Sequence, residues 1–158
     1  MEDKERFKSN PYNNNNKLIN HSDIINIMHS LNINNFKIND IEYYRRSFIH
    51  KSYCKLKDYE EFTNTQNHLD LQDKSYETLE FLGDSILGSI ITNYLYHRYY
   101  LIYNQNEGFL TKLKNKIVNG EMLGFLSNKL GFNNYMIISE HIEKNCNGRN
   151  NFRILEDI

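Results

Sequence analysis

The sequence is poor in the residues that break helices and in those that cross-link a fold. Its 158 residues include one proline, seven glycines, two cysteines and no tryptophan. So few prolines and glycines indicate long, uninterrupted elements, and helices in particular. Cys54 and Cys146 lie far apart and neither belongs to a CxxC pair, which argues against a disulfide scaffold or a zinc site. Free thiols are typical of a reducing compartment, so we expect a cytoplasmic protein, with the nucleus as the alternative.

The chain also lacks a long apolar run and a strong net charge. No segment approaches 18 consecutive apolar residues, and the opening MEDKERFKSN does not resemble a signal peptide, so we expect no membrane contact. A net charge of -1 gives no overall attraction to nucleic acid. A polyanionic partner would therefore have to be met by a local basic patch or by metal ions.

The chain divides into a polar start and one domain. Residues 1–20 are rich in asparagine and hold the only proline, and we interpret them as a flexible arm. Residues 21–158 form a domain large enough for a hydrophobic core, and no convincing alternating strands occur in it. We therefore predict the all-α class.

Apolar residues at helical spacing mark the expected helices. Ser22 and Asp40 are the candidate N-caps of the first two. Residues 54–74 lack periodicity and read as a long loop, as do residues 143–151, whereas residues 135–139 fit a short helical turn. The helix expected over 75–100 is apolar around most of its circumference, which predicts burial on nearly all sides. The expected helical ranges are 22–31, 40–53, 75–100, 107–119, 120–130 and a last helix from 152.

Three acids open the helix expected over 75–100. Glu77, Glu80 and Asp84 stand at i, i+3 and i+7, which places them on one helix face. Acids in a first turn can simply complement the helix dipole. However, Asp84 lies beyond the first turn and would be costly to bury alone, and Gly83 costs about 1 kcal/mol relative to alanine in a helix. A face of carboxylates can instead hold a hard divalent cation such as Mg²⁺, which prefers oxygen ligands.

Four segments of the sequence resemble the motifs of the ribonuclease III family, in the family's order. YETLEFLGDSIL is similar to the signature E-x-L-E-F-L-G-D-x-x-L, and FIHKSY, residues 48–53, resembles the upstream T-H-x-S-Y element. EGFLTKLKNKIVNGEMLGFLSNKLGF, residues 107–132, resembles the helix E-G-x-L-(S/T)-x-L. ILEDI, residues 154–158, resembles the opening of I-L-A-D-x-F-E-A.

This resemblance implies a helical-bundle endonuclease domain that acts as a homodimer. Family members hydrolyse double-stranded RNA with Mg²⁺, for which Mn²⁺ can substitute, and leave 5′-phosphate and 3′-hydroxyl ends. The carboxylates that match the family's catalytic metal ligands are Glu80, Asp84 and Asp157. Two further acids, Glu77 and Glu107, match positions that line the cleft of the dimer.

Other positions carry supporting roles by the same resemblance. Phe81 matches the aromatic residue that packs into the partner subunit. His50 and Ser52, with Lys51 between them, fall in the upstream element and are expected to support the site structurally. The lysines that are candidates for RNA phosphate contacts are Lys112, Lys114, Lys116 and Lys129. For any one of these lysines, a merely solvated helix face is an equally good interpretation.

The sequence departs from the family pattern after Asp157. It ends at Ile158, two residues before the position of the family's next glutamate, and without a double-stranded-RNA-binding module. We expect a fragment of a longer polypeptide that, by itself, binds Mg²⁺ weakly and cleaves poorly. Two alternatives stay open: a non-catalytic double-stranded RNA-binding or scaffold module of the same fold, and an all-α protein-interaction domain whose acids only cap a helix.

Overall fold

The structure, a computed structural model, describes residues 9–158 and is helical throughout, as the sequence predicts. Within that range, extended pairing is limited to two isolated bridges, Ile49 with Ile137 and Cys54 with Gln72. The α-helices are α1 (His21–Ser30), α2 (Ile41–Ser47), α3 (Glu77–Leu95), α4 (Leu101–Tyr103), α5 (Glu107–Ile117), α6 (Gly120–Lys129), α7 (Glu140–Asn145) and α8 (Phe152–Leu155). No helix in the described range is both long and apolar enough to cross a bilayer.

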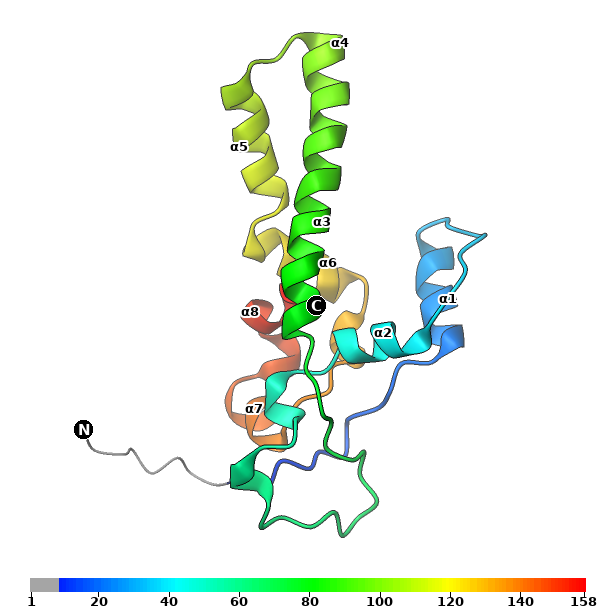
Figure 1. The fold of residues 1–158 in the computed structure, drawn as a ribbon, viewed down its shortest axis with the longest axis vertical. Coiled ribbons are helices and arrows are strands. Elements are labelled where there is room, and N and C mark those ends of the chain that lie inside the picture. The colour runs from blue at the N-terminus through cyan, green and yellow to red at the C-terminus, as the bar shows by residue number, and fades with distance from the viewer. Residues whose placement is uncertain (1–8) are drawn as a thin grey trace, which may run out of the picture.

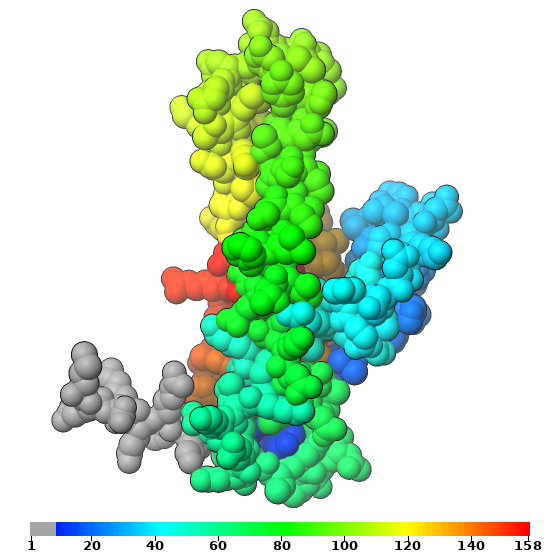
Figure 2. Space-filling view, viewed as in Figure 1, coloured from blue at the N-terminus to red at the C-terminus, as the bar shows by residue number. Residues whose placement is uncertain are grey.

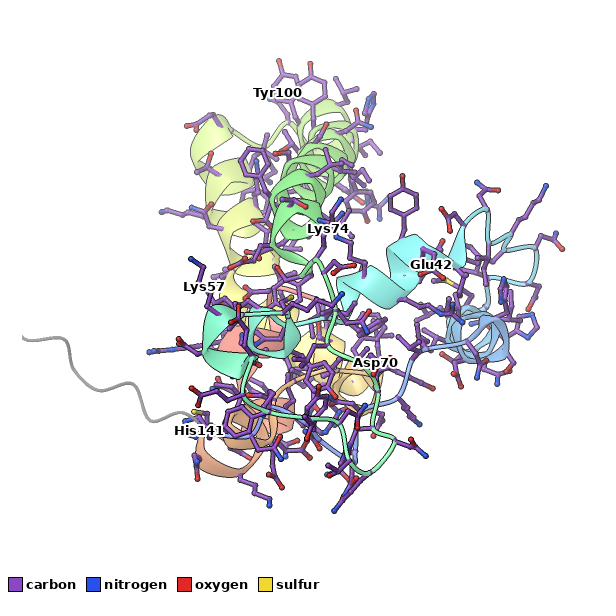
Figure 3. All side chains as sticks on the ribbon, turned by 60° about the horizontal axis from the view of Figure 1, so that its bottom comes forward. Glu42, Lys57, Asp70, Lys74, Tyr100 and His141 are labelled. Atoms are coloured by element: carbon purple, nitrogen blue, oxygen red, sulfur yellow. The ribbon has the colours of Figure 1, made fainter. Side chains whose placement is uncertain are left out.

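The longest helix forms one arm of a tall hairpin. A π-helical turn, Tyr96–Tyr100, joins α3 to α4, and α5 returns along α3 (Figure 1). Asn104 adopts a left-handed conformation at φ 50° to end α4, and the Asn106 side chain accepts a hydrogen bond from the Phe109 amide at 2.9 Å to begin α5. The hairpin projects beyond the remaining helices, with Tyr100 at its tip (Figures 1 and 3).

The expectation that this helix is buried on nearly all sides is wrong. Among the residues of α3, only Leu95 is buried, while Phe81 is 80% exposed and Ile90 is 59% exposed. The reason is that α5 covers one side only, and in Figure 2 the surface of α3 runs uncovered along the near face of the molecule. The apolar circumference of α3 therefore contributes little to the core of the single chain.

The core lies below the hairpin and is built around an extended segment. Met136, Ile137 and Ile138 are fully buried. The Ile137 amide donates to the Phe48 carbonyl at 2.8 Å, and the Ile137 carbonyl accepts from the His50 amide at 3.0 Å. The expected helical turn over 135–139 is therefore wrong, because a 3₁₀ turn occupies Phe132–Asn134 and the next residues pair as a strand would.

The C-terminal third holds more helix than expected. Residues 143–151, interpreted from the sequence as a loop, contain the end of α7 and a 3₁₀ turn at Gly148–Asn150. The Arg149 side chain organises this region: it donates to the Met136 carbonyl at 2.7 Å and to the Glu143 carboxylate at 3.1 Å. These contacts tie the turn to the buried extended segment.

Part of the expected N-terminal arm belongs to the fold. Residues 1–8 lie outside the described range, but Pro11 is fully buried and Asn13 is 4% exposed. The Asn13 amide donates to the Ile138 carbonyl at 3.1 Å, and Asn16 exchanges two hydrogen bonds with Ile138. The expectation of a flexible arm is thus corrected for residues 9–20, whose asparagines satisfy the backbone of the extended segment.

The first two helices begin close to where the sequence places them. Asp40 caps α2 as predicted, accepting from the Glu42 amide at 2.9 Å. The cap of α1 is Asn20 rather than Ser22, because Asn20 and Asp23 form a reciprocal capping box. The region 54–74 is a loop apart from a 3₁₀ turn at Lys57–Tyr59, as expected.

Candidate active site

A cleft of about 310 Å³ opens where the first turns of α3 face α6 and the end of α8. Apolar side chains form its floor and carboxylates stand around it. The polar residues that line it are Ser47, Tyr76, Glu80, Asp84, Ser127, Glu156 and Asp157. The structure therefore brings the three predicted metal-binding carboxylates to one place from two helices.

The electrostatics of this cleft follow from the carboxylates being close together. Burial, followed by the negative charges of Asp157 and Asp84, raises the pKa of Glu80. Burial also raises the pKa of Asp157, to which Glu156 and Asp84 add, while a hydrogen bond from Tyr76 opposes the rise. Within the described residues, the side chains of Glu80 and Asp84 make no hydrogen bond or ion pair.

Tyr76 links the two halves of the cleft, and sequence reasoning missed it. Its hydroxyl donates to Asp157 Oδ2 at 3.2 Å, and its amide donates to the Ile49 carbonyl at 2.9 Å. The side chain is 3% exposed, and its ring lies against His50 with 5.9 Å between centroids. Its position, directly before the acidic helix and four residues before Glu80, is the signal that could have found it.

The upstream element lies beneath the cleft. His50 Nδ1 accepts from the Ser52 amide at 3.2 Å, and Ser52 Oγ accepts from the Ser139 amide at 3.0 Å. These bonds connect the turn at Lys51–Tyr53 to the buried extended segment. The contacts are those that a structural supporting role for His50 and Ser52 requires, and that role stays a prediction.

His50 is expected to make the fold sensitive to mild acid. Burial, helped by the charge of Lys51, lowers the pKa of His50 to about 4, against about 6.5 in an unfolded chain. Between these values only the unfolded state takes up the proton, so stability is lost as pH falls from about 6.5 to 4. The loss is at most about 3 kcal/mol. Urea unfolding at neutral and acidic pH measures it.

The control for this prediction is His50→Asn, whose amide oxygen can replace Nδ1 as the acceptor for Ser52. The pKa of Glu77 is lowered mainly by its hydrogen bond with Lys51, which the variant keeps, so the difference between the two acid losses reports mainly on His50. The variant should lose less stability on acidification than the wild type. Equal losses in the two proteins would contradict the assignment.

Two glycines of α6 allow close packing of α8, the helix that precedes Asp157. A Cβ at Gly124 would lie 2.8 Å from the Phe152 carbonyl oxygen and 3.2 Å from its Cα. A Cβ at Gly120 would coincide with the Glu156 carboxylate, at 1.4 Å from Oε2. The backbone of α8 thus crosses α6 at Gly124, and this close approach fixes where Asp157 enters the cleft.

We expect Gly124→Ala to destabilise the fold by about 2 kcal/mol, because the methyl group meets backbone atoms that have no room to move. The displaced α8 should also lower any activity that depends on Asp157. Gly108→Ala is the matched control, since its Cβ would meet only Asn106 Oδ1, at an ordinary 3.5 Å. Urea unfolding that shows equal stability for the two variants would rule out this close packing of α8 on Gly124.

The two predicted cleft acids lie elsewhere in the single chain. Glu77 is absent from the cleft lining and pairs with Lys51, whose Nζ is 3.1 Å from Oε1. Glu107 begins α5 at the tip of the hairpin, roughly 25 Å along α3 from Asp84 by helical rise. One chain alone therefore does not place Glu107 in its own cleft.

The sequence argument from Asp84 and Gly83 is corrected as well. Asp84 is exposed, so no burial penalty requires a partner for it. A Cβ at Gly83 would find no atom within 4 Å, so no close approach within this chain explains the glycine. What singles out Asp84 is its position on the cleft beside Glu80 and Asp157.

The candidate phosphate-binding lysines do not line this cleft. Lys114 is half-buried on a groove between α3 and α5, and its Nζ would be 3.9 Å from a Cβ at Gly88. Lys112, Lys116 and Lys129 are exposed. Their proposed contacts with RNA stay predictions.

The cleft has oxygen donors of the kind that bind hard cations, but these donors are not grouped closely enough to coordinate one directly. In residues 9–158, no three histidine, cysteine, aspartate or glutamate side chains lie close enough to hold a metal ion as they stand. Its titratable donors are oxygens, and burial, followed by repulsion from neighbouring carboxylates, raises the pKa values of Glu80 and Asp157. Mg²⁺ keeps several waters and needs only one or two direct carboxylates, so these residues fit it.

The three helices around the cleft, and most of the residues that line it, lie in a segment that matches a known family. The sequence profile of the Ribonuclease III domain matches residues 77–156. A "Probable ribonuclease 3" of Acanthamoeba polyphaga mimivirus is 38% identical over 147 residues, which cover 91% of this chain and 27% of that protein. Ribonuclease 3 of Leptospira interrogans is 35% identical over 113 residues, 72% of this chain and 39% of that protein. The chain thus spans well under half the length of these relatives.

Solved structures agree with the fold. The nuclease domain of ribonuclease III from Campylobacter jejuni superposes with a TM-score of 0.63 and 22% identity, covering 87% of this chain and 76% of that chain. A second structure of that domain, described as flexible in a region involved in dimer formation, gives a TM-score of 0.61 at 25% identity, covering 85% of this chain and 77% of that chain.

Proposed function

Because this chain belongs to the ribonuclease III family, we propose that it is the endonuclease domain of an Mg²⁺-dependent enzyme that cleaves double-stranded RNA. The observation that carries the proposal is the meeting of Glu80, Asp84 and Asp157 at one cleft. Burial and repulsion make the charges of Glu80 and Asp157 costly, and none of the three acids forms an ion pair within the described residues. A structural role alone gives no return for that cost.

The chain's residues divide the work as follows. Glu80, Asp84 and Asp157 would hold Mg²⁺, or Mn²⁺ in its place, and Tyr76 keeps the Asp157 carboxylate oriented through its hydrogen bond. When bound, the ion supplies an activated water and stabilises the leaving 3′-oxygen of the phosphodiester, which gives 5′-phosphate and 3′-hydroxyl ends. Leu87, Leu123 and Leu126 also line the cleft and give part of its wall an apolar surface.

The proposal includes a homodimer built on the exposed face of α3. Phe81 projects from the helix between Glu80 and Leu82 and is 80% exposed, which is unusual for so large an apolar side chain. A region involved in dimer formation is described for the Campylobacter jejuni domain, and this supports proposing a dimer here. In such a dimer the hairpin tip of one subunit could bring Glu107 to the cleft of the other, which its own chain does not do.

Substrate recognition in this proposal is mainly by shape. A-form RNA presents phosphates and 2′-hydroxyl groups across a shallow minor groove, and bases are hard to reach from outside the duplex. A cleft of carboxylates holding cations suits a phosphodiester and makes no contact with base identity. We therefore propose double-stranded RNA as the substrate class.

The test is cleavage of an end-labelled RNA duplex, with the same strand unpaired as a control. We expect cleavage of the duplex in Mg²⁺ or Mn²⁺ and none in EDTA, with the single strand left intact. The experiment should use this chain and, in parallel, the longer polypeptide of its relatives' length. Duplex binding without cleavage by either form at any Mg²⁺ concentration would show a non-catalytic module instead.

A further inference from the structure

A second hollow lies on the other side of the start of α3 and is rimmed by cations. It measures about 580 Å³, and four basic side chains stand around it: Arg46, Lys51, Lys55 and Lys74. We propose that this basic hollow binds a backbone phosphate of the RNA strand that passes the acidic cleft. The inference rests on the proposed function and adds to it a specific contact surface, which differs from the lysines of α5.

The charges of the basic hollow exceed what its own carboxylates neutralise. Lys51 pairs with Glu77 at 3.1 Å and Lys55 with Asp73 at 2.7 Å. The side chains of Glu77 and Asp73 are 51% and 79% exposed, so these are surface ion pairs of small net value that a phosphate can replace. Lys74 is exposed and makes no ion pair within the described residues, and Figure 3 shows it at the base of α3.

The Arg46 side chain, which lines the hollow, is held in place by hydrogen bonds. Its Nε donates to the Ser75 carbonyl at 2.9 Å, and its terminal nitrogen donates to Thr78 Oγ1. The guanidinium is therefore held against the first residues of α3 rather than free in solvent. A positioned cation loses less conformational entropy on binding an anion than a mobile one does.

The start of α3 adds an independent attraction for anions at the same place. Ser75, Glu77 and Thr78 line the hollow, and α3 runs for 19 residues from Glu77. The N-cap residue, Tyr76, provides no side-chain cap, and the Glu77 amide has only a long 3.4 Å hydrogen bond to Ser75 Oγ. The weakly bonded Glu77 amide favours a phosphate here, while the Glu77 and Glu80 carboxylates of the first turn offset part of the helix dipole.

The position of the hollow suits an RNA strand engaged in the cleft. Glu77 lines the hollow and Glu80 lines the cleft, so the two sites are separated by about one turn, roughly 5 Å along α3. A strand whose scissile phosphate meets the acids would carry a neighbouring phosphate over the first turn of α3. Cations there offset the repulsion between RNA and the acidic cleft.

The test compares two double variants with equal changes in charge. Lys55→Met with Lys74→Met removes two cations from the hollow, and Lys37→Met with Lys144→Met removes two exposed cations that line neither the hollow nor the cleft. Both are made in the Glu80→Gln protein, so that duplex RNA stays intact while fluorescence anisotropy measures its binding across a salt series. Thermal unfolding should show that neither pair changes the fold, because all four side chains are exposed.

We expect the hollow variant to bind duplex RNA about 10-fold more weakly at low salt, with the slope of log K against log salt reduced by about 1 to 2. The Lys37→Met/Lys144→Met variant should bind within about 3-fold of its parent, as a general change in charge would give. Equal affinities and slopes for the two variants would overturn the inference. RNA binding without cleavage, both by this chain and by the longer polypeptide, would instead overturn the proposed function and leave the hollow standing, whereas no RNA binding by either form would overturn both.

Discussion

Replacing Glu80 with glutamine should lower the rate of duplex RNA cleavage by about 10³-fold while leaving RNA binding nearly unchanged. Glu80 interacts with both other acids of the cleft, since Asp157 and Asp84 add to the rise in its pKa that burial causes. Glutamine keeps the shape of the side chain and removes its charge, so a cation loses a ligand and the RNA contacts stay. Single-turnover cleavage and anisotropy measure the two effects separately.

The stability of the same variant makes the prediction sharper. Because the charge of Glu80 is disfavoured in the folded chain, removing it should leave the protein in EDTA at least as stable as the wild type. Glu77→Gln is the matched control from the same helix, and it should lose less than about 10-fold in rate, because Glu77 faces Lys51 outside the cleft. Equal losses for the two variants would contradict the assignment of the cleft.

Replacing Phe81 with aspartate should convert a dimer into monomers and abolish cleavage with it. An 80% exposed phenyl ring on an apolar helix surface fits the central contact of an interface, where one aromatic residue can contribute 2 kcal/mol or more, about 30-fold in affinity. A buried carboxylate at that point adds a desolvation cost. Light scattering across a concentration series measures the association.

The control for Phe81→Asp is Tyr43→Asp. Tyr43 is 62% exposed on α2, away from the surface of α3, and should tolerate the change with no effect on association. Thermal unfolding at low concentration should be similar for both variants, because neither side chain is part of the core. A Phe81→Asp protein that stays dimeric would exclude the exposed face of α3 as the interface.

The candidate site was partly predictable from the sequence. Helical spacing alone places Glu80 and Asp84 on one face of α3, and the structure puts both on the cleft. Spacing alone does not predict that Asp157, more than 70 residues later, lies in the same cleft. Only the resemblance of ILEDI to a family motif indicates this. Tyr76 donates a hydrogen bond to Asp157, and the sequence gives no sign of this role except that Tyr76 directly precedes Glu77.

The features that the sequence did not predict depend on contacts between distant residues. Asn13 and Asn16 look like parts of a polar arm until their amides meet Ile138, more than 120 residues away. Ile137 lies in a segment expected to be a helical turn, but it pairs with the backbone of Phe48 and His50. The apolar circumference of α3 signals burial, which the single chain does not provide; in the proposed homodimer a second subunit would cover this face.

The central claim is that the acids of the cleft bind a divalent cation, and thermal unfolding of the metal-loaded chain tests it most directly. The wild type and an Asp84→Asn/Asp157→Asn variant are melted at neutral pH in EDTA and in increasing Mg²⁺. A ligand that binds only the folded state raises the melting temperature in proportion to the logarithm of its concentration above Kd. The account predicts that rise for the wild type and its loss in the variant. The same Mg²⁺-induced rise in both proteins, or none in the wild type, would contradict it.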